Sequence, residues 1–175
     1  MLQSDKNITP RKKMKKILLL VILINGLSLY AKDDLSLKTY ENSRFEFLID
    51  YPSKIFVNKE FPANGDGIFL SNQDKSVTLT PSGSHAIIVS DIKEIYKKYI
   101  NWIEEEKNTQ LTYKVQKKNW FILSGFKENK KTIFYEKRML VNETLIGYEL
   151  TYPTAKKKRY NPIIKILNKS LKKIK

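Results

Sequence analysis

The sequence has no cysteine, a single histidine and only four arginines in 175 residues. Without cysteine, disulfides, thiolate nucleophiles and cysteine-ligated metals are all excluded. A zinc site built on histidine and cysteine needs three or four such ligands, and His85 is the only one present. We therefore expect neither a bound metal nor a cofactor, and a domain that relies on its hydrophobic core.

Long apolar runs are also missing. The uninterrupted run Ile17–Ile24 is far shorter than the roughly 20 residues that span a bilayer. It follows two lysines and is followed by Ala31, which is the pattern of a secretory signal peptide. We interpret residues 14–31 as that signal peptide and residues 1–13, which are polar, as an upstream extension of the reading frame. The alternative is an uncleaved N-terminal anchor.

Positive charge is in excess beyond residue 31, where 27 basic residues face 17 acidic ones and leave a net charge of +10. Such an excess favours association with anionic lipid or nucleic acid. Nucleic-acid sites, however, rely on arginine for bidentate contacts, and only Arg44, Arg138 and Arg159 remain in this part. We expect no nucleic-acid partner and at most a weak association with anionic surfaces.

Strand patterns occupy most of the rest of the chain. Residues 44–51 alternate apolar and polar side chains and end at Pro52, which predicts a half-buried strand. Two short strands, "GIFLSN" and "SVTLTP", surround the turn "NQDK". Four more, "LTYKVQKKN", "WFILSGF", "KTIFYEKRMLV" and "TLIGYELTYP", are separated by brief polar connections. Such connections force antiparallel neighbours and predict a meander.

Two segments have helical periodicity. Residues 91–107 carry an apolar face, and Asp91 with Glu94 resembles a capping box. Near the C-terminus, Asn161 suits an N-cap and Pro162 the first helical position. The order of elements predicts an α+β domain over residues 40–175, after a tail at 32–39, with an antiparallel sheet covered by two helices. Its buried residues should include Phe47, Ile49, Ile95, Tyr99, Trp102, Ile133 and Leu167.

The stretch "NGDG" at residues 64–67 raises the question of a cation site. Asn64, Asp66 and Asp74 could supply oxygens to calcium, but a calcium loop needs six to eight oxygens and usually a bidentate glutamate. No glutamate occurs in the following "SNQDKS". Asn-Gly and Asp-Gly are also turn dipeptides, so we interpret "NGDG" and "NQDK" as turns that bind no metal.

No catalytic motif is evident. His85 could pair with Ser82, Ser84 or Ser124, and Asp91 is nearby in sequence, but no Gly-x-Ser-x-Gly elbow surrounds these serines. We interpret His85 as a polar loop residue. Two carboxylates could act together, yet their pairing in space is invisible to sequence. A candidate ligand groove between helix and sheet would use four aromatic residues that also suit a core: Tyr96, Tyr99, Trp102 and Trp120.

Several of these stretches together are similar to a known group of proteins: "YENSRFEFLIDYP", "NGDGIFLSNQDKSVTLTPSGSH", "NWFILSGFKENKKTIFYEK", "YELTYP" and "YNPI". They resemble small exported bacterial proteins of unknown function related to the PsbP-like fold, which is named after an extrinsic protein of photosystem II. The resemblance implies an αβα sandwich with a central antiparallel sheet. Its motifs are structural, so it implies no activity and no catalytic residue.

From these observations we expect an exported protein, in the periplasm of a Gram-negative bacterium. We expect it to be a non-enzymatic binding or accessory module of the cell envelope whose partner is an envelope protein or a small ligand. Two alternatives remain open. One is an envelope hydrolase that uses carboxylates or His85, and the other is a lysine-rich binder of anionic surfaces.

Overall fold

The computed structural model describes residues 35–86 and 91–174. The predicted extension 1–13 and signal peptide 14–31 lie outside the described residues. The elements, in order, are β1 (Leu37–Asn42), β2 (Phe47–Pro52), β3 (Asn58–Glu60), β4 (Phe69–Ser71), β5 (Thr78–His85), α2 (Ile92–Glu105), β6 (Gln110–Gln116), β7 (Trp120–Lys127), β8 (Thr132–Val141), β9 (Thr144–Pro153), the 3₁₀ helix η1 (Thr154–Lys156), α3 (Lys157–Ser170) and β10 (Lys172–Lys173).

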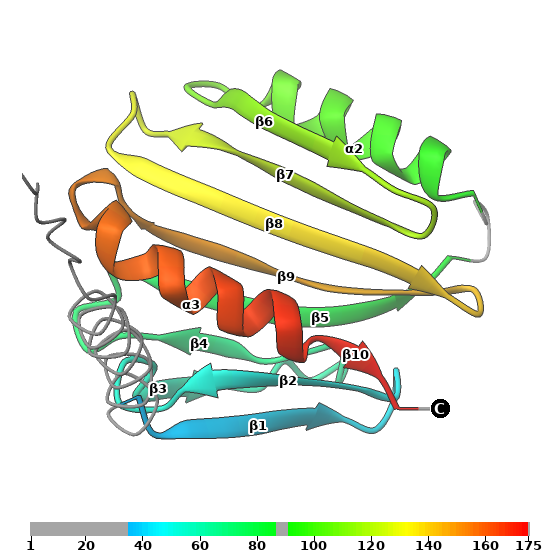
Figure 1. Cartoon of the computed structure of the whole chain (residues 1–175), viewed down its shortest axis with the longest axis horizontal. Helices are drawn as coiled ribbons and strands as arrows, with labels where there is room; N and C mark the ends of the chain where they lie inside the picture. Colours follow the sequence, from blue (N-terminus) through cyan, green and yellow to red (C-terminus); the bar gives the residue numbers. More distant parts are fainter. Residues whose placement is uncertain (1–34, 87–90, 175) are drawn as a thin grey trace, which may run out of the picture. The chain divides into compact units, whose positions relative to one another are not determined.

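The larger sheet has seven strands in the order β3-β4-β5-β9-β8-β7-β6, and every neighbouring pair is antiparallel. Strands β6 to β9 follow one another across the sheet, as the short polar connections predicted (Figure 1). Strand β5, from the predicted hairpin, pairs with β9 and joins the meander to β4 and β3. The prediction of an α+β domain with an antiparallel sheet is confirmed.

The smaller sheet has the order β1-β2-β10 and was not predicted. The alternating strand at residues 44–52 is its central strand β2, so it does not belong to the larger sheet. Strand β1 begins at Leu37 and therefore takes up part of the segment interpreted as a tail. The inward side chains of β2, Phe47 and Ile49, are fully buried, because this sheet covers a face of the larger one.

The two faces of the larger sheet have separate hydrophobic cores. On one face, Ile146, Tyr148 and Leu150 of β9 pack with β2 and α3, and we call this the α3 face. On the other, Leu145 of β9 packs with Phe121 and with α2, and we call this the α2 face. Successive side chains of a strand point to opposite sides, so the alternation along β9 assigns the two helices to opposite faces.

Helix α2 agrees with its prediction. It spans Ile92–Glu105, and the Asp91 side chain caps it by accepting a hydrogen bond from the Lys93 backbone N–H at 2.9 Å. Helix α2 lies along the edge of the sheet beside β6 (Figure 1). Because only one side of an edge helix meets the sheet, part of its apolar stripe stays in solvent.

Helix α3 begins earlier than predicted. It starts at Lys157, directly after η1, so Asn161 is not its N-cap and Pro162 lies inside it. The prediction was wrong because the Tyr160 ring is buried and stacks on Tyr152 with centroids 4.9 Å apart. This packing holds the lysine-rich segment before Asn161 in helical conformation, so that segment is not a loop.

Asn168 anchors α3 on the sheet. Its side chain accepts a hydrogen bond from the Tyr148 hydroxyl at 2.9 Å and donates one to the Tyr135 hydroxyl at 2.8 Å. Its carbonyl oxygen accepts a third from Lys137 Nζ at 2.9 Å. Three side chains of β8 and β9 thus fix the helix at one position along the strands.

Most of the predicted buried residues are buried. Phe47, Ile49, Ile95, Ile133 and Leu167 are at most 6% exposed, and Tyr99 is partly buried. Trp102 was wrongly predicted, because 68% of it is exposed. It lies at the solvent side of the edge helix, with its ring 6.0 Å from that of Tyr99. In the part of the chain that the structure describes, no helix has the length and apolar character needed to cross a membrane.

Candidate functional site

The structure does not bring the four predicted groove residues together. Tyr96 and Tyr99 pack against Phe121 on the α2 face, at centroid distances of 5.5 and 5.2 Å. Trp120 adjoins Phe121 in β7 and pairs with Met139, so it lies on the α3 face. There Lys137 Nζ lies 5.7 Å from its ring. The sheet itself therefore separates Trp120 from the two tyrosines.

His85 lies at the exposed end of β5, not in a loop. Its ring contacts Phe45 at a centroid distance of 5.0 Å. The serines considered as partners are engaged elsewhere or point away: Ser82 accepts from Arg138, and Ser124 donates to the Phe134 carbonyl. Ser84 is the strand neighbour of His85 and so faces the opposite side. No serine–histidine pair forms among these residues.

The "NGDG" stretch is organised around Arg44. The guanidinium donates to the Asn64 carbonyl oxygen and to the Asp66 carboxylate, the latter at 2.8 Å. The Asn64 amide donates to the same carboxylate at 2.7 Å. Gly65 has φ of +68°, as the turn interpretation required. Among residues 35–86 and 91–174, no three acidic or histidine side chains are placed as metal ligands.

Gly67 is required for a different reason from Gly65. Its φ is not positive; a Cβ at this position would collide with the carbonyl oxygen of Pro81. Gly67 forms an isolated bridge with Ser82 of β5, and the Gly83 N–H donates to the Asp66 carbonyl at 2.8 Å. The glycine thus permits a close approach between two backbones.

The "NQDK" segment closes the β4–β5 hairpin. Asp74 accepts hydrogen bonds from the backbone N–H of Ser76 at 3.0 Å and from its hydroxyl at 2.6 Å. These hydrogen bonds lower the pKa of Asp74. The Asn72 side-chain oxygen accepts from the Val77 N–H at 2.9 Å. Both residues therefore stabilise the turn through their side chains.

A buried ion pair lies on the α2 face at the centre of the sheet. Arg138 binds Glu136 through two nitrogens, each 2.7 Å from the same carboxylate oxygen, and donates to Ser82 at 2.9 Å. The side chains are 13% and 6% exposed. Gly147 pairs with Arg138 across β8 and β9, and a Cβ there would press on the arginine side chain.

Glu149 lies directly opposite Glu136 in the register of β8 and β9. Its carboxylate pairs with Lys127 at 3.2 Å, and Lys127 also reaches Glu106 at 3.5 Å. Two carboxylates on adjacent strands are the kind of pair used in acid–base chemistry. Here each carboxylate already has a cationic partner.

The environment shifts the pKa values in this cluster. Burial raises the pKa of Glu136; Arg138 opposes this effect and Glu149 adds to it. Burial lowers the pKa of Lys127, but the attraction of Glu149 and Glu106 outweighs it and leaves that pKa above its ordinary value. The cluster is thus a network of paired charges in a poorly solvated place.

An open groove lies on the α3 face beside the helix, with a volume of about 450 Å³. Its floor is the inner side of β7, β8 and β9, and one wall is α3. We call it the aromatic groove; its main lining residues are Tyr113, Phe126, Ile133, Tyr135, Tyr152, Lys157, Asn161, Ile164 and Lys165. Helix α3 lies beside β9, and none of the described helices covers β6 and β7 on this face (Figure 1).

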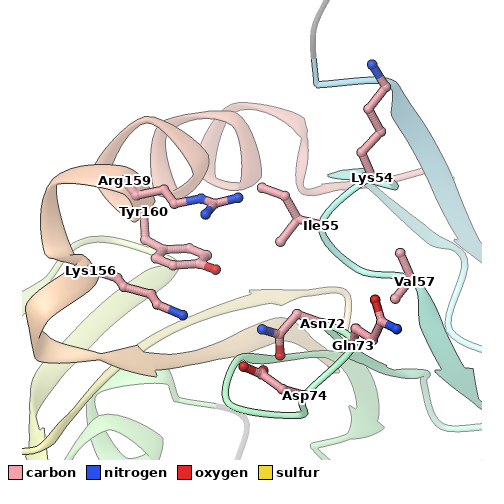
Figure 2. A pocket seen from close by; sticks show the side chains of 9 residues that line it. All are labelled: Lys54, Ile55, Val57, Asn72, Gln73, Asp74, Lys156, Arg159 and Tyr160. Carbon is pink, nitrogen blue, oxygen red and sulfur yellow. The ribbon is translucent and has the colours of Figure 1, made fainter.

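A second hollow, of about 590 Å³, lies on the other side of α3. Figure 2 shows it between the start of α3, the loop after β2 and the β4–β5 turn. We call it the basic hollow; its lining residues are Lys54, Ile55, Val57, Asn72, Gln73, Asp74, Lys156, Arg159 and Tyr160. The stacked rings of Tyr152 and Tyr160 separate it from the aromatic groove.

Solved structures share this arrangement of sheets and helices. Cyanobacterial PsbP (CyanoP) from Synechocystis sp. PCC 6803 aligns with a TM-score of 0.61 and 9% identity over 79% of this chain and 92% of its own. The fold is PsbP-like. The Ran-binding protein Mog1p of Saccharomyces cerevisiae aligns with a TM-score of 0.54 and 10% identity, over 80% of this chain and 96% of its own.

The PsbP-like fold confirms the resemblance found in the sequence. No protein-family model matches the chain, and no curated protein matches its sequence. At such low identity the likeness extends to the fold alone, and a fold does not imply a function. The site must therefore be argued from the residues of this chain.

The opposed pair Glu136 and Glu149 was missed in the sequence, although a signal existed. Asn142 and Glu143 form a two-residue turn in which both have positive φ, of 47° and 59°. Such a turn fixes the register of a hairpin, and counting back from it places the two glutamates opposite one another. The two hollows had no such signal, because they join segments far apart in the chain.

Proposed function

We propose that this protein is an exported, non-enzymatic binding module of the cell envelope, and that the aromatic groove is its main binding surface. The observation that carries the proposal is the groove itself: aromatic and aliphatic side chains form an open floor, and lysines of α3 stand beside it. Its volume lies in the range of about 300–1,000 Å³ that is usual for ligand pockets. Tyr113, at the rim, is 51% exposed.

The groove suits a ligand with an apolar body and a negative group. Tyr113, Phe126 and Ile164 offer apolar surface, whose removal from water favours binding by roughly 25 cal/mol per Å². Lys157 and Lys165 line the helix side and would attract a carboxylate or sulfonate. Either a small amphiphile or an acidic apolar segment of an envelope protein has this chemistry.

The enzymatic alternative rests on Glu136 and Glu149, which are opposed across two strands. A general base must be free to take a proton from a substrate, whereas Glu136 is 4% exposed and is held by Arg138. His85 stands apart from the serines. This is why we favour binding over hydrolysis. Hydrolysis of a chromogenic ester that is lost in Glu149→Gln would reverse the preference.

Binding to the groove can be measured with 1-anilinonaphthalene-8-sulfonate, which has an apolar body and one negative charge. We expect saturable fluorescence with the folded full chain, and weaker binding after Tyr113→Ser or Ile164→Ser. Trp102→Ser is the matched control, because it removes an aromatic side chain that is 68% exposed on the other face. Equal loss in all three variants, or no binding, would contradict the proposal.

Export is tested separately. We expect the protein purified from the envelope of the cells that produce it to begin near Lys32, after cleavage at Ala31. Mass spectrometry of the intact protein measures this directly. An N-terminus at Met1 or Met14 would contradict cleavage and favour the uncleaved anchor.

A further inference from the structure

We propose that the basic hollow is a second binding site, and that it binds the phosphate group of a small ligand. The proposal does not depend on the aromatic groove, which lies on the opposite side of α3. Three hydrogen-bond donors carry it: Lys156, the last residue of η1, and Arg159 and the hydroxyl of Tyr160, both in the first turn of α3. Figure 2 shows their polar ends directed into the same space.

In the described part of the chain, neither the Lys156 nor the Arg159 side chain forms a hydrogen bond or an ion pair with another residue. By contrast, Arg44 binds Asp66, and Arg138 binds Glu136. Arg159 therefore keeps its full set of donors for a ligand. Its planar guanidinium matches two oxygens of a phosphate group at once.

Tyr160 adds a donor at a fixed position. Its side chain is 2% exposed and its ring is stacked on Tyr152, so the hydroxyl cannot move far. Burial raises the pKa of Tyr160, and the hydroxyl therefore keeps its proton at neutral pH. The Asn72 amide is on the opposite wall, where it donates to the Ser76 hydroxyl at 3.2 Å and also hydrogen-bonds Asp74.

Asp74 determines where in the hollow a phosphate can lie. Its carboxylate is held in the turn by two hydrogen bonds from Ser76, and Lys156 attracts it. A phosphate would be repelled from this end, so it should lie against Arg159 and Tyr160. Ile55 and Val57 form the remaining wall. The hollow is larger than one phosphate, and these two residues suit a carbon skeleton attached to it.

The test is isothermal titration calorimetry. The full chain is titrated with inorganic phosphate and, separately, with glycerol 3-phosphate, at constant ionic strength. We expect saturable binding that Arg159→Gln weakens roughly tenfold or more, because a charge-assisted bidentate contact is lost. Lys158→Gln is the matched control. It removes one positive charge from the adjacent position of the same helix, but Lys158 lines neither the hollow nor the groove.

A second variant tests the geometry with the opposite sign. Asp74→Asn keeps an oxygen that can accept from Ser76 and removes the repulsion, so it should strengthen phosphate binding. Vesicles of phosphatidic acid, tested in parallel, identify the source of the phosphate. If Arg159→Gln weakens binding to vesicles as it weakens binding to soluble phosphate, a lipid headgroup can occupy the site; an effect in solution alone indicates a soluble ligand.

Three results would overturn the proposal. The first is the absence of saturable phosphate binding. The second is an equal loss in Arg159→Gln and Lys158→Gln, which would indicate general attraction by the positive surface. The third is weaker binding after Asp74→Asn. None of these results bears on the aromatic groove, whose dye binding is measured independently.

Discussion

Replacing Arg138 by methionine should destabilise the domain strongly, because it leaves the Glu136 carboxylate buried without its partner. Methionine retains much of the length and apolar contact of the arginine stem, so packing changes little. The lost contacts are the two at 2.7 Å to Glu136 and the hydrogen bond to Ser82. Removing one member of a buried ion pair costs about 3–5 kcal/mol, a large part of the stability of an ordinary domain.

The loss should depend on pH in a defined direction. In the folded protein the pKa of Glu136 is already raised by burial and by Glu149, and loss of Arg138 raises it further. Folding then binds a proton between the unfolded pKa, about 4.3, and the raised folded pKa. Stability therefore falls as pH rises through that window. Relative to the wild type, the variant should lose least below the unfolded pKa and most above the folded one.

The assay is urea denaturation followed by circular dichroism at several pH values, with the wild type measured alongside so that other titrating groups cancel. Glu136→Leu in the Arg138→Met background is the decisive control. Replacing a whole buried pair by apolar residues is often neutral or stabilising, so the double variant should regain most of the stability. A loss below about 1 kcal/mol at pH 7, or one that persists in the double variant, would refute the reasoning.

Further predictions concern the turns and the aromatic residues. In chemical denaturation, Gly67→Ala should destabilise the domain more than Gly65→Ala does. The new Cβ at position 67 would collide with the backbone of β5. The Cβ at position 65 would meet only the strain of positive φ, which costs about 1–3 kcal/mol. Tyr99→Ala should lower the free energy of unfolding by about 2–4 kcal/mol. Trp102→Ala, at an exposed position, should lower it by less than about 1 kcal/mol. Similar losses in the two variants would contradict this prediction. Asp66→Asn should cost less than about 1 kcal/mol, since its pair with Arg44 is solvated, and calcium should not raise the melting temperature of the wild type. A clear calcium-dependent rise would reverse our interpretation of "NGDG".

Local patterns in the sequence were sufficient for the elements whose partners are near in the chain. The meander from β6 to β9 follows from alternating side chains and short turns, because such turns leave a strand no neighbour but the one before it. Helix α2 follows from its 3.6-residue period and from Asp91, whose side chain caps it. Each of these features depends on contacts within about thirty residues.

Features that depend on distant segments were not predictable in this way. Strand β2 alternates as any half-buried strand does, and nothing local indicates that it pairs with β10, at the far end of the chain, in a sheet separate from the larger one. Helix α3 was placed too late, because Pro162 is a strong local signal for a helix start. The burial of Tyr160 against Tyr152 outweighed that signal.

The same division applies to the candidate sites. The sequence by itself determined that no cysteine or histidine cluster exists, and that the charge is strongly positive. The tertiary structure decided which charges are paired: Arg138 is buried with Glu136, while Arg159 faces an open hollow. Both arginines have lysines nearby in the sequence, and the local sequence does not show which of the two is paired. Burial and pairing are set by the strands and turns that come to lie beside each side chain, and those come from distant parts of the chain.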